Sequence, residues 1–479
     1  MSVDVCDSNG RLFFTDSAWS ITRLIGDLNS AMPGDTVIYS REDGCPIQFA
    51  AHAITAGVGG IITDQSLSCP IPQYVVHDVD AAVDRAAAAM LNRPWREIYT
   101  VAVIGGAGKT TTALLVATMM RGVGYRVAYR TDLGSSDGVT QHVDNTIENG
   151  SAALQNWMAD AIDANCDVAL VELDESNIHS DSLIGGIDML VIAPGSSNTD
   201  AVESFGPDKI HAGLDAMHPE GVAVVCGDCV KTHRQVLNSG RRLLSYGMRK
   251  RSDVSAKIFD QQPGITTLVV HAGDTSAMME TQLTGGQMAV CQLAAISVGL
   301  LLEQTLPDAI QQVSRLQQVP GRLQCLRSEY GKARVVLDAA ADGNSLSGVL
   351  RDMRREKGTG RLWCVAGLGT TDGNTLARIG NALERFADNV VLTTGDIPSA
   401  SFLAASHGVM DGVKECALMR LVADRETAIR WVLDHAGKND TVLILGGIGG
   451  QTPAQRRAKI NATQSIFAEQ SSRQPQPIY

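Results

Sequence analysis

The sequence predicts an α/β protein of three domains, and three observations lead to this prediction. The chain has 479 residues, enough for about three domains. Apolar, β-branched runs alternate with helical runs along most of its length. Two breaks, at 92–94 and at 320–321, interrupt this alternation. We therefore expect a small N-terminal α/β domain (1–98), a central doubly wound sheet (99–320) and a C-terminal Rossmann-like α/β domain (321–479).

Composition and charge exclude several classes of protein. Hydrophobic residues make up 44% of the chain and charged residues 19%, as in globular proteins. The net charge of −12 argues against nucleic acid or an anionic membrane as a partner. The N-terminus lacks the pattern of a secretory signal, and no run of about 18 apolar residues exists. The ten cysteines are scattered, so we expect buried free thiols and a cytoplasmic location.

The N-terminal domain should contain three strands and two helices. The expected strands are 36–39, 60–63 and 73–76, and the expected helices are 49–56 and 81–91. In the central domain we expect strands at 99–104, 126–130, 167–173, 189–193 and 222–226, with helices at 113–120, 152–164, 284–304 and 308–316. A polar loop is expected at 131–138. In the C-terminal domain the expected strands are 333–338, 361–365, 389–393 and 441–445, and the expected helices are 345–356, 376–385 and 425–435.

The strand at 99–104 leads into the motif on which the functional prediction depends. It is followed by Gly105, Gly106, Ala107 and Gly108, then by Lys109, Thr110 and Thr111. A strand, a glycine turn, Lys-Thr and a helix form a phosphate-binding loop, because glycine lets backbone N–H groups converge on phosphate oxygens. Lys109 would reach the β- and γ-phosphates, and the Thr110 hydroxyl would hold Mg²⁺. The sequence therefore predicts a P-loop in the central sheet that binds the phosphates of a nucleotide together with Mg²⁺.

A carboxylate lies at the end of another strand of the central domain. The strand 167–173 contains Glu172, and Asp174 and Glu175 follow it. Because Mg²⁺ takes one or two carboxylates plus phosphate oxygens, Glu172 is a candidate metal ligand. The lone C-x-x-C pair, Cys226 and Cys229, has no second pair and no histidine cluster nearby, so a metal or redox role is not expected.

The order of these parts resembles the ATP-dependent Mur ligases, nearest to the tripeptide-forming branch that adds a third amino acid to a UDP-muramoyl dipeptide. The similar segments cover nearly the whole chain: I-G-G-A-G-K-T-T-T at 104–112, V-E-L-D-E-S at 171–176, L-T-G-G-Q-M-A-V-C-Q-L-A-A-I at 283–296, V-P-G-R-L-Q at 319–324 and V-V-L-D-A-A-A-D-G-N-S-L at 335–346. The third is similar to the family's L-x-G-x-F-N-x-x-N-x-x-A-A. In the first domain M-P-G-D at 32–35 and the segment 43–58 are also similar to family motifs.

The resemblance implies a reaction and roles for residues. In this family ATP phosphorylates a carboxylate, and an amine attacks the acyl phosphate to form an amide. Carried over, Lys109 and Thr110 hold the triphosphate and Mg²⁺, Glu172 holds Mg²⁺, and Arg322 and Asp338 touch the adenosine end. Lys209 is the nearest match to the family's carbamylated lysine, and an ordinary helix-start lysine is the alternative. The implied substrates are a UDP-muramoyl peptide and an amino acid.

The sequence departs from the family pattern at several substrate contacts. The family's metal-binding D-H appears as Asn198-Thr199, and His179, His211 and His218 are possible but weak replacements. The departures at substrate motifs are these: Asp27-Leu28-Asn29 stands for D-S-R, Ala340 to Gly343 for A-H-T-P, Asp396 to Ser399 for D-N-P-R, and Gly446 to Gln451 for G-K-G-H-E. The sequence therefore predicts retained nucleotide binding and altered contacts to the acyl substrate and the incoming amino acid.

Three functions fit these observations. The first is a divergent Mur-type ligase with an altered amino acid or acyl substrate. The second is a degenerate paralogue that binds ATP and acts as a non-catalytic partner or regulator. The third is another P-loop class, the partition-type ATPases or targeting GTPases. The segment Asp132-Leu133-Gly134-Ser135 matches the switch motifs of that class poorly, and membership of the class would leave V-P-G-R unexplained. The sequence favours the ligase.

Overall fold

The structure is a computed structural model of the whole chain, described here for most of its residues. The described residues are 21, 23–142, 151–173, 183, 185–195, 205–249, 252–326, 333–340, 343–415, 419–450 and 452–472. Three sheets account for the strands in this part of the chain, with four, eleven and six strands. The predicted α/β fold class is confirmed.

The first sheet is small and parallel. Its order is β1 (Leu24–Ile25), β2 (Thr36–Tyr39), β3 (Gly60–Thr63) and β4 (Gln73–Val75). Helix α1 (Pro46–Ala56) follows β2 and ends at Gly57, whose φ of 71° suits the left-handed cap of a helix. Helix α2 (Val79–Met90) buries Ala82, Val83 and Ala86 against this sheet. The apolar side chains of α1 and α2 therefore close the two faces of the sheet.

The second sheet is the largest and carries the predicted phosphate loop near its centre. Its order is β15-β14-β13-β12-β11-β10-β5-β9-β6-β7-β8. The strands from β13 to β6 pair in parallel, whereas both edges are antiparallel. Their bounds are β5 Tyr99–Ile104, β6 Val127–Thr131, β7 Gly134–Ser136, β8 Gln141–His142, β9 Val168–Glu172, β10 Ile187–Ile192, β11 Met217–Cys226, β12 Arg242–Gly247, β13 Val254–Gln262, β14 Ile265–Ala272 and β15 Thr275–Thr281.

Helices cover both faces of this sheet. On one face α3 (Lys109–Val123), α8 (Gly286–Leu301) and α9 (Leu306–Val313) pack together, and Val101 and Val103 of β5 point toward them. On the other face α4 (Ser151–Asp163) and α6 (Pro207–Asp215) pack on Ala102 and Ile104, while α7 (Val230–Asn238) follows β11. Side chains of β5 point alternately to the two faces of the sheet, and both faces are buried by helices. This explains why the strand is almost continuously apolar.

The third sheet is parallel except at one edge. Its order is β16 (Gln324–Leu326), β17 (Arg334–Asp338), β21 (Thr441–Leu445), β18 (Leu362–Leu368), β19 (Asn389–Thr394) and β20 (Met419–Leu421), with β16 antiparallel to β17. The helices of this region are α10 (Gly343–Glu356), α11 (Gly373–Phe386), α12 (Phe402–Met410), α13 (Arg425–His435) and α14 (Pro453–Ser472).

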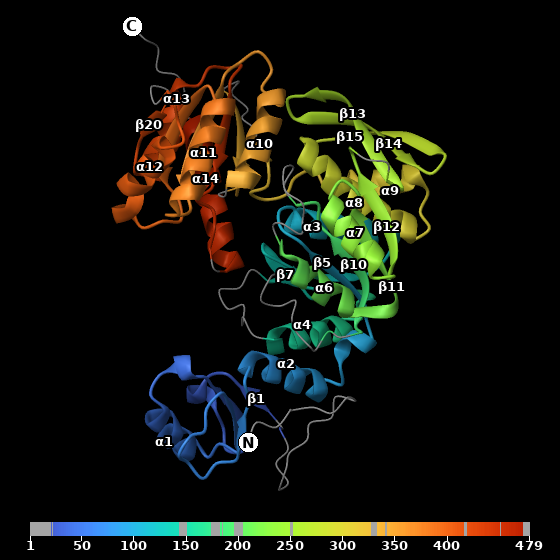
Figure 1. Cartoon of the computed structure of the whole chain (residues 1–479), viewed down its shortest axis with the longest axis vertical. Helices are drawn as coiled ribbons and strands as arrows, with labels where there is room; N and C mark the ends of the chain where they lie inside the picture. The colour runs from blue at the N-terminus through green and yellow to red at the C-terminus, as the bar shows by residue number, and fades with distance from the viewer. Residues whose placement is uncertain are drawn as a thin grey trace.

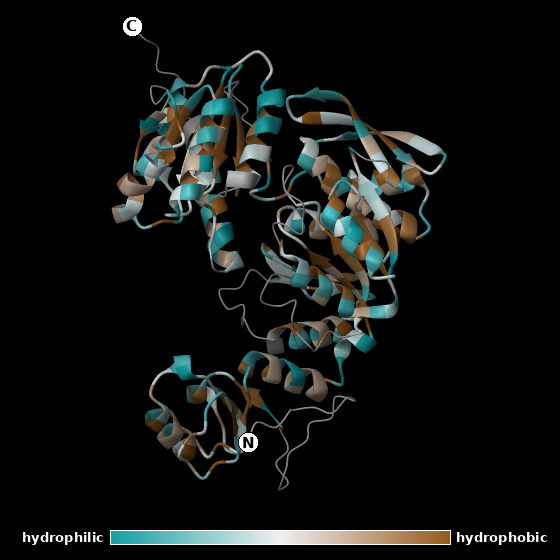
Figure 2. Cartoon of the chain, viewed as in Figure 1, coloured by the Kyte–Doolittle hydropathy of each residue, from teal (hydrophilic) through white to brown (hydrophobic). Residues whose placement is uncertain are grey.

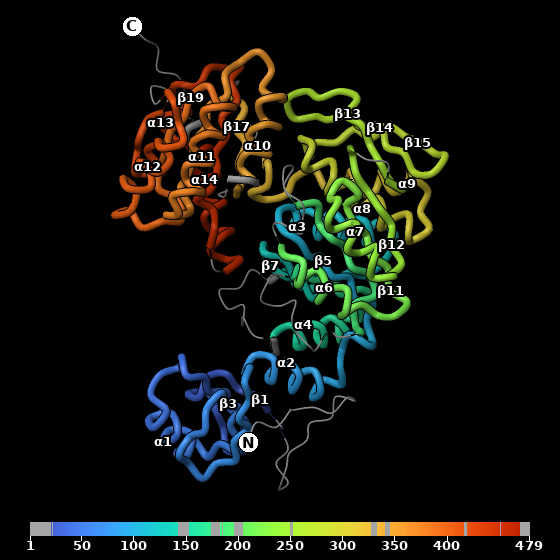
Figure 3. Tube along the Cα trace, in the orientation of Figure 1, coloured from blue at the N-terminus to red at the C-terminus, as the bar shows by residue number. Residues whose placement is uncertain are grey.

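The three sheets form three separate bodies in space (Figure 1). The chain path can be followed in Figure 3, and Figure 2 shows apolar strands enclosed by helices with polar outer faces. Among the described residues no sheet contains strands from both sides of residue 98 or of residue 320. The domain boundaries at these positions stay predictions. Helix α2 links the first two bodies, because it also packs against α4 and Asp84 accepts a hydrogen bond from Gln155.

The structure differs from the sequence-based expectations in several places. The expected loop 131–138 contains β7, which forms a hairpin with β6. The three strands β13 to β15 and the twenty-residue helix α14 were not expected. The cysteines are not all buried, since Cys45 is exposed and Cys69 and Cys325 are half-buried, although all eight in the described part are free thiols. Within that part, no helix is long and apolar enough to cross a membrane.

A buried ion pair provides a test of the C-terminal body. The Glu356 side chain is fully buried, and its Oε2 accepts a hydrogen bond from Arg334 Nη2 at 2.9 Å, while its Oε1 accepts one from Gln261 Nε2 at 2.9 Å. Removing one partner of a buried pair leaves an uncompensated charge. We expect Glu356→Ala to destabilise this body by about 3 kcal/mol, measured by chemical denaturation. Glu426→Ala is the control, because the Glu426 side chain is 56% exposed in its ion pair with Arg430. A loss of unfolding free energy for Glu356→Ala no larger than that for the control would contradict the prediction.

Candidate functional site

The phosphate loop has the backbone geometry that its glycines allow. Strand β5 ends at Ile104, and Gly105 (φ 121°) and Gly108 (φ 93°) adopt the positive φ that other residues rarely take. A Cβ at Gly105 would lie 3.2 Å from the Ala193 carbonyl oxygen, so the loop also needs glycine for its close approach to β10. Helix α3 begins at Lys109, and its N-terminus therefore points into the loop. This is the arrangement that binds phosphate groups through backbone N–H donors.

Thr110, Glu172 and Asp132 meet at the start of α3. The Thr110 hydroxyl donates a hydrogen bond to Glu172 Oε1 at 3.0 Å, and the backbone N–H of Asp132 donates to Glu172 Oε2 at 3.1 Å. The three residues come from α3, from the end of β9 and from the residue after β6. They meet because β5, β9 and β6 are parallel neighbours whose carboxyl ends share one edge of the sheet.

The Glu172 carboxyl is strongly desolvated. Burial, and secondly the negative charge of Asp132, raise its pKa to about 7, against the opposing effect of the Lys109 ammonium and the two hydrogen bonds. The Lys109 ammonium therefore compensates the charge of the ionised carboxylate only in part. Its environment therefore suits binding of a positively charged group beside Thr110.

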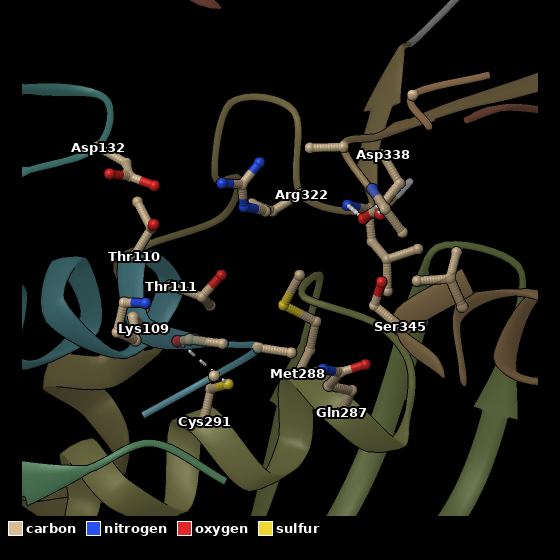
Figure 4. Close-up of a pocket in the computed structure, with 18 of the residues that line it drawn as sticks. Lys109, Thr110, Thr111, Asp132, Gln287, Met288, Cys291, Arg322, Asp338 and Ser345 are labelled. Carbon is tan, nitrogen blue, oxygen red and sulfur yellow. Dashed lines mark hydrogen bonds between the residues drawn. The ribbon is translucent and has the colours of Figure 1, made fainter. Parts of the chain in front are cut away.

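A cavity of about 530 Å³ extends from this point to the third sheet (Figure 4). Figure 4 shows Arg322 above the phosphate loop, with Asp132 on one side and Asp338 on the other. The residues of the central body that line it are Gly106, Ala107, Gly108, Lys109, Thr110, Thr111, Asp132, Glu172, Gln287, Met288 and Cys291. Those from the linker and the C-terminal body are Arg322, Leu323, Asp338, Ala339, Ala340, Ser345, Val349, Gly369, Thr370 and Thr375.

The far end of the cavity is shaped by Asp338. This carboxylate accepts hydrogen bonds from the backbone N–H of Leu323 at 2.7 Å and of Ala340 at 2.8 Å. Burial raises its pKa, while these bonds and the nearby Arg322 guanidinium lower it. Asp338 thereby fixes the segment that carries Arg322 onto the end of β17, and both predicted adenosine-end residues line one cavity with the phosphate loop.

The donor set at the phosphate end fits Mg²⁺. It offers the Thr110 hydroxyl and the carboxylates of Glu172 and Asp132, and oxygen ligands are the kind that Mg²⁺ prefers. Among the described residues no group of three His, Cys, Asp or Glu side chains could hold an ion by itself. A metal here would thus depend on phosphate oxygens as well. Asp174 and Glu175 lie outside the described residues.

Lys209 lies close to the phosphate-loop lysine through a shared aromatic ring. The Lys109 Nζ is 5.8 Å and the Lys209 Nζ 5.7 Å from the centroid of the buried Phe205 ring. Both distances are in the range of cation–π contact. Lys209 does not line the cavity of Figure 4, and its proposed carbamylation stays a prediction. Gly105 also belongs to the loop without lining the cavity.

The two candidate histidines in the described part of the chain, His211 and His218, do not line this cavity. His218 is exposed and is the second residue of β11. It lies at the amino end of that strand, whereas the phosphate loop lies at the carboxyl edge of the sheet. His211 is on α6 and exposed. Neither lines the cavity. His179, Asn198 and Thr199 lie outside the described residues.

Two cavity residues replace asparagines of the resembled family. In the segment 283–296, Met288 and Cys291 stand at the positions of the two asparagines in L-x-G-x-F-N-x-x-N. Both side chains line the cavity, and burial raises the pKa of the Cys291 thiol to about 11. The wall therefore offers soft, polarisable sulfur contacts in place of directional amide hydrogen bonds.

Helix α14 connects the C-terminal body to the carboxylate cluster. Arg456 Nη1 donates to the Asp132 carbonyl oxygen at 3.0 Å and lies 3.4 Å from Asp132 Oδ1, and Arg457 Nε donates to the Leu133 carbonyl oxygen at 2.8 Å. Figure 1 shows α14 extending from the C-terminal body toward β7. Asp132, whose backbone N–H donates to Glu172, is therefore contacted by residues of two domains. Sequence reasoning missed both Asp132 and Arg456; the position of Asp132 directly after a parallel strand was the available signal.

A second polar cluster lies at the carboxyl edge of the third sheet. Asp396 Oδ1 forms an ion pair with Lys459 Nζ at 2.6 Å, and Ser399 is exposed at the start of a short 3₁₀ helix, Ser399–Ser401. The Arg425 guanidinium is buried there, which lowers its pKa to about 10. It packs against Gly367 and Gly447, where any Cβ would clash with it. Gln451 lies outside the described residues.

Comparison with known proteins identifies similar chains. Residues 321–448 match the family model "Mur ligase, glutamate ligase domain". A UDP-N-acetylmuramoyl-L-alanyl-D-glutamate–2,6-diaminopimelate ligase of Thermosynechococcus vestitus is 28% identical over 436 residues, which is 88% of this chain and 85% of that protein. A UDP-N-acetylmuramyl-tripeptide synthetase of Deinococcus radiodurans is 25% identical over 410 residues, or 83% of each chain.

The three-dimensional comparison agrees with the sequence matches. The crystal structure of a MurF ligase from Thermotoga maritima in complex with ADP aligns with a TM-score of 0.65 and 16% identity, covering 94% of this chain and 97% of that one. At this identity the likeness shows a shared fold. Because the alignment covers 94% of this chain, it includes residues of all three bodies of Figure 1.

Protonation of Glu172 should make stability depend on pH. Its folded-state pKa of about 7 lies above the usual value of 4.5. Between these two pH values the folded state therefore binds more protons than the unfolded state. The metal-free protein should therefore lose stability as the pH rises from about 4.5 to about 7. Thermal melting across this range should show that Glu172→Gln flattens this loss; an unchanged pH profile would refute the assignment. Exposed Glu426→Gln is the control.

The contact between α14 and the β6–β7 hairpin should matter for nucleotide binding. Each arginine donates a charge-assisted hydrogen bond across the domain interface. We expect the double variant Arg456→Ala, Arg457→Ala to weaken Mg-ATP binding about tenfold, corresponding to about 1.4 kcal/mol, in a calorimetric titration. Lys459→Ala, on the same helix but paired within the C-terminal body, should change the affinity less than twofold. Equal affinities for the double variant and the wild type would contradict the role of this contact.

Proposed function

We propose that this chain, a divergent member of the Mur ligase family, is an ATP-dependent ligase that joins a carboxylate to an amino acid through an amide bond, in the synthesis of peptidoglycan precursors. The observation that carries the proposal is the single cavity in which the phosphate loop, Glu172, Arg322 and Asp338 meet at the junction of two domains. The names of the relatives and the ADP-bound structural neighbour support ATP as the nucleotide.

The proposed reaction has two steps. An oxygen of the substrate carboxylate attacks the γ-phosphorus of ATP, the bond to the β,γ-bridging oxygen breaks, and ADP leaves. The amine of the amino acid then attacks the carbonyl carbon of the acyl phosphate. An amide forms as the nitrogen releases a proton to solvent, and phosphate leaves with the electron pair of the broken C–O bond. Both steps bring anions together, so the protein must neutralise and position charge.

The residues of the cavity suit this task. The backbone N–H groups of 106–111 and the Lys109 ammonium bind the β- and γ-phosphates. Thr110 and Glu172 would hold Mg²⁺, which would supply positive charge to neutralise the phosphate groups. Arg322 and Asp338 would contact the adenosine end. Lys209, which shares Phe205 with Lys109, is proposed to act on the γ-phosphate side.

The non-catalytic alternative has no observation in its favour. A degenerate paralogue would be expected to lose parts of the nucleotide site, yet the phosphate loop, the Thr110–Glu172 contact and the Asp338 cap are all intact. Several changed residues lie at the family's substrate motifs, such as Ser399 at the place of an arginine, while Met288 and Cys291 alter the wall of the nucleotide cavity and leave its phosphate end unchanged. Altered substrate choice explains this distribution better than loss of catalysis.

The proposal is tested by coupled release of ADP and phosphate. Purified protein is incubated with Mg-ATP, a panel of UDP-muramoyl peptides and single amino acids. We expect ADP release that depends on one peptide and one amino acid. Lys109→Ala should lower the rate by at least about 10³-fold, because a group that neutralises transferring phosphoryl charge is removed. Lys414→Ala, an exposed lysine of the C-terminal body, is the matched control. No substrate-dependent ADP release across the panel would reject the ligase function.

The acceptor should differ from meso-diaminopimelate. In the resembled family an arginine of the D-N-P-R loop pairs with the distal carboxylate of this amino acid, and Ser399 offers one neutral hydrogen bond instead. An unpaired buried carboxylate costs on the order of 1–3 kcal/mol or more. We expect no turnover of diaminopimelate with the standard UDP-muramoyl dipeptide in the same assay. Turnover on the order of 1 s⁻¹ or faster would show that this prediction is wrong.

A further inference from the structure

A second cavity, of about 600 Å³, lies beside the nucleotide cavity and has no part in the proposed reaction. It is bounded by the carboxyl ends of β10, β11 and β12, by β13, by the first turn of α8 and by α10. We call it the α8–α10 cavity. Of its lining residues only Gln287 also lines the nucleotide cavity. Ligands of open parallel sheets bind beyond the carboxyl ends of strands, which is where this cavity lies.

The charged residues around this cavity come from two domains. Arg249 and Lys257 belong to the central body, and Arg351 and Arg355 belong to α10 of the C-terminal body. The two carboxylates that line it are Asp228 and Asp352. The cavity thus has an excess of two positive charges in a chain whose net charge is −12. Such a local excess attracts anions.

Both carboxylates are occupied by backbone groups. Asp228 accepts hydrogen bonds from the N–H of Met248 at 2.7 Å and of Arg249 at 2.9 Å. Asp352 accepts one from the N–H of Gln287 at 3.2 Å, and burial raises its pKa. These acids hold the β12 loop and the start of α8 in place. They are therefore structural parts of the cavity wall.

The walls between the charges are largely apolar. The apolar part of the wall consists of Met248, Ala256, Ile258 and Val290, together with the thiols of Cys226 and Cys229. Among the described residues Lys257 and Arg355 are exposed and enter into no ion pair. A volume of this size, with apolar walls and a few convergent charged groups, is typical of small-molecule sites.

We propose that the α8–α10 cavity is a second ligand site, which takes a small molecule bearing two anionic groups and thereby bridges the central and C-terminal domains. One anionic group lies between the cations of the central body and the other near Arg351 and Arg355. Guanidinium groups suit both phosphate and carboxylate, because they donate two parallel hydrogen bonds. The site stands whether or not the protein is a ligase.

Helix α10 and Gln287 connect this site with the nucleotide cavity, so a ligand bound here can affect nucleotide binding. Helix α10 contributes Ser345 and Val349 to the nucleotide cavity and Arg351 and Arg355 to the second one. Gln287 lies between the cavities, and its Nε2 donates to the Gly195 carbonyl oxygen at 3.3 Å. A dianion that bridges α10 and β13 therefore contacts an element that also lines the nucleotide cavity. Coupling of this kind is reciprocal between the two ligands.

The experiment separates this site from the phosphate loop. Calorimetric titrations use the full-length Lys109→Ala variant without Mg²⁺, so that the phosphate loop is impaired. Pyrophosphate is the phosphate probe and citrate the carboxylate probe. We expect one of them to bind, and the one that binds identifies the chemistry of the natural ligand. Adding Lys257→Gln and Arg355→Gln should weaken that binding at least tenfold.

The matched control removes the same charge elsewhere. Lys414→Gln with Lys438→Gln changes two exposed lysines that do not line this cavity, and should alter the affinity less than twofold. Because Lys257 and Arg355 are exposed, the paired variant should melt within about 2 °C of its parent. Absence of binding by both probes, or equal weakening by the two variant pairs, would overturn the site.

A second measurement tests the bridging of the domains. In otherwise wild-type protein, the probe that binds should tighten Mg-ADP binding at least threefold, and the Lys257→Gln, Arg355→Gln pair should abolish this effect. Unchanged Mg-ADP affinity in the presence of the probe would overturn the bridging. Because the first titration uses no nucleotide, its outcome does not depend on that of the ligase assay.

Discussion

The nucleotide site depends on one carboxylate, Glu172, that is held between the Thr110 hydroxyl and the Asp132 backbone N–H. Three parallel strands must end at one edge of the sheet for these contacts to exist, and the glycine turn must leave α3 pointing at the same spot. Burial raises the pKa of this carboxyl far above its usual range. The ionised carboxylate therefore carries a buried negative charge that a bound cation can compensate.

The second constraint is that the site is shared by two domains. The central body supplies the phosphate end of the cavity, while Arg322 and Asp338 close the other end. Helix α14 adds a contact on the far side of the carboxylate cluster, where Arg456 binds Asp132. Movement of the C-terminal body would change both ends of the cavity together. The buried Glu356, with partners on β17 and on the β13 strand, belongs to the same interface.

The C-terminal body also shows how a site can change while its scaffold is kept. At its carboxyl edge the buried Arg425 guanidinium occupies the space that side chains at Gly367 and Gly447 would need. The polar groups at this edge, Asp396 and Lys459, are paired with each other. Ser399 lies exposed beside them. Substrate preference can shift at such loops without disturbing the packed sheet beneath.

The sequence alone determined the elements whose signal is local. Strands β2, β3, β5 and β21 and helix α13 have the predicted bounds, because β-branched runs and capping residues act within a few positions. The glycine turn with Lys109 and Thr110 was readable for the same reason. The strands β13 to β15 were missed, since their polar, half-exposed alternation lacks a buried run. Helix α14 was missed because its polar sequence has no apolar stripe along one face.

Only the tertiary structure decided which distant residues meet. Asp132 and Arg456 are 324 positions apart, and no local pattern connects them. The pairing of Lys109 with Lys209 around Phe205, and of α10 with α8 around a second cavity, likewise follows from strand order and domain packing. Contacts of this kind depend on the summed geometry of a whole sheet. A sequence specifies that geometry only through the cooperative burial of its core, which local reading cannot resolve.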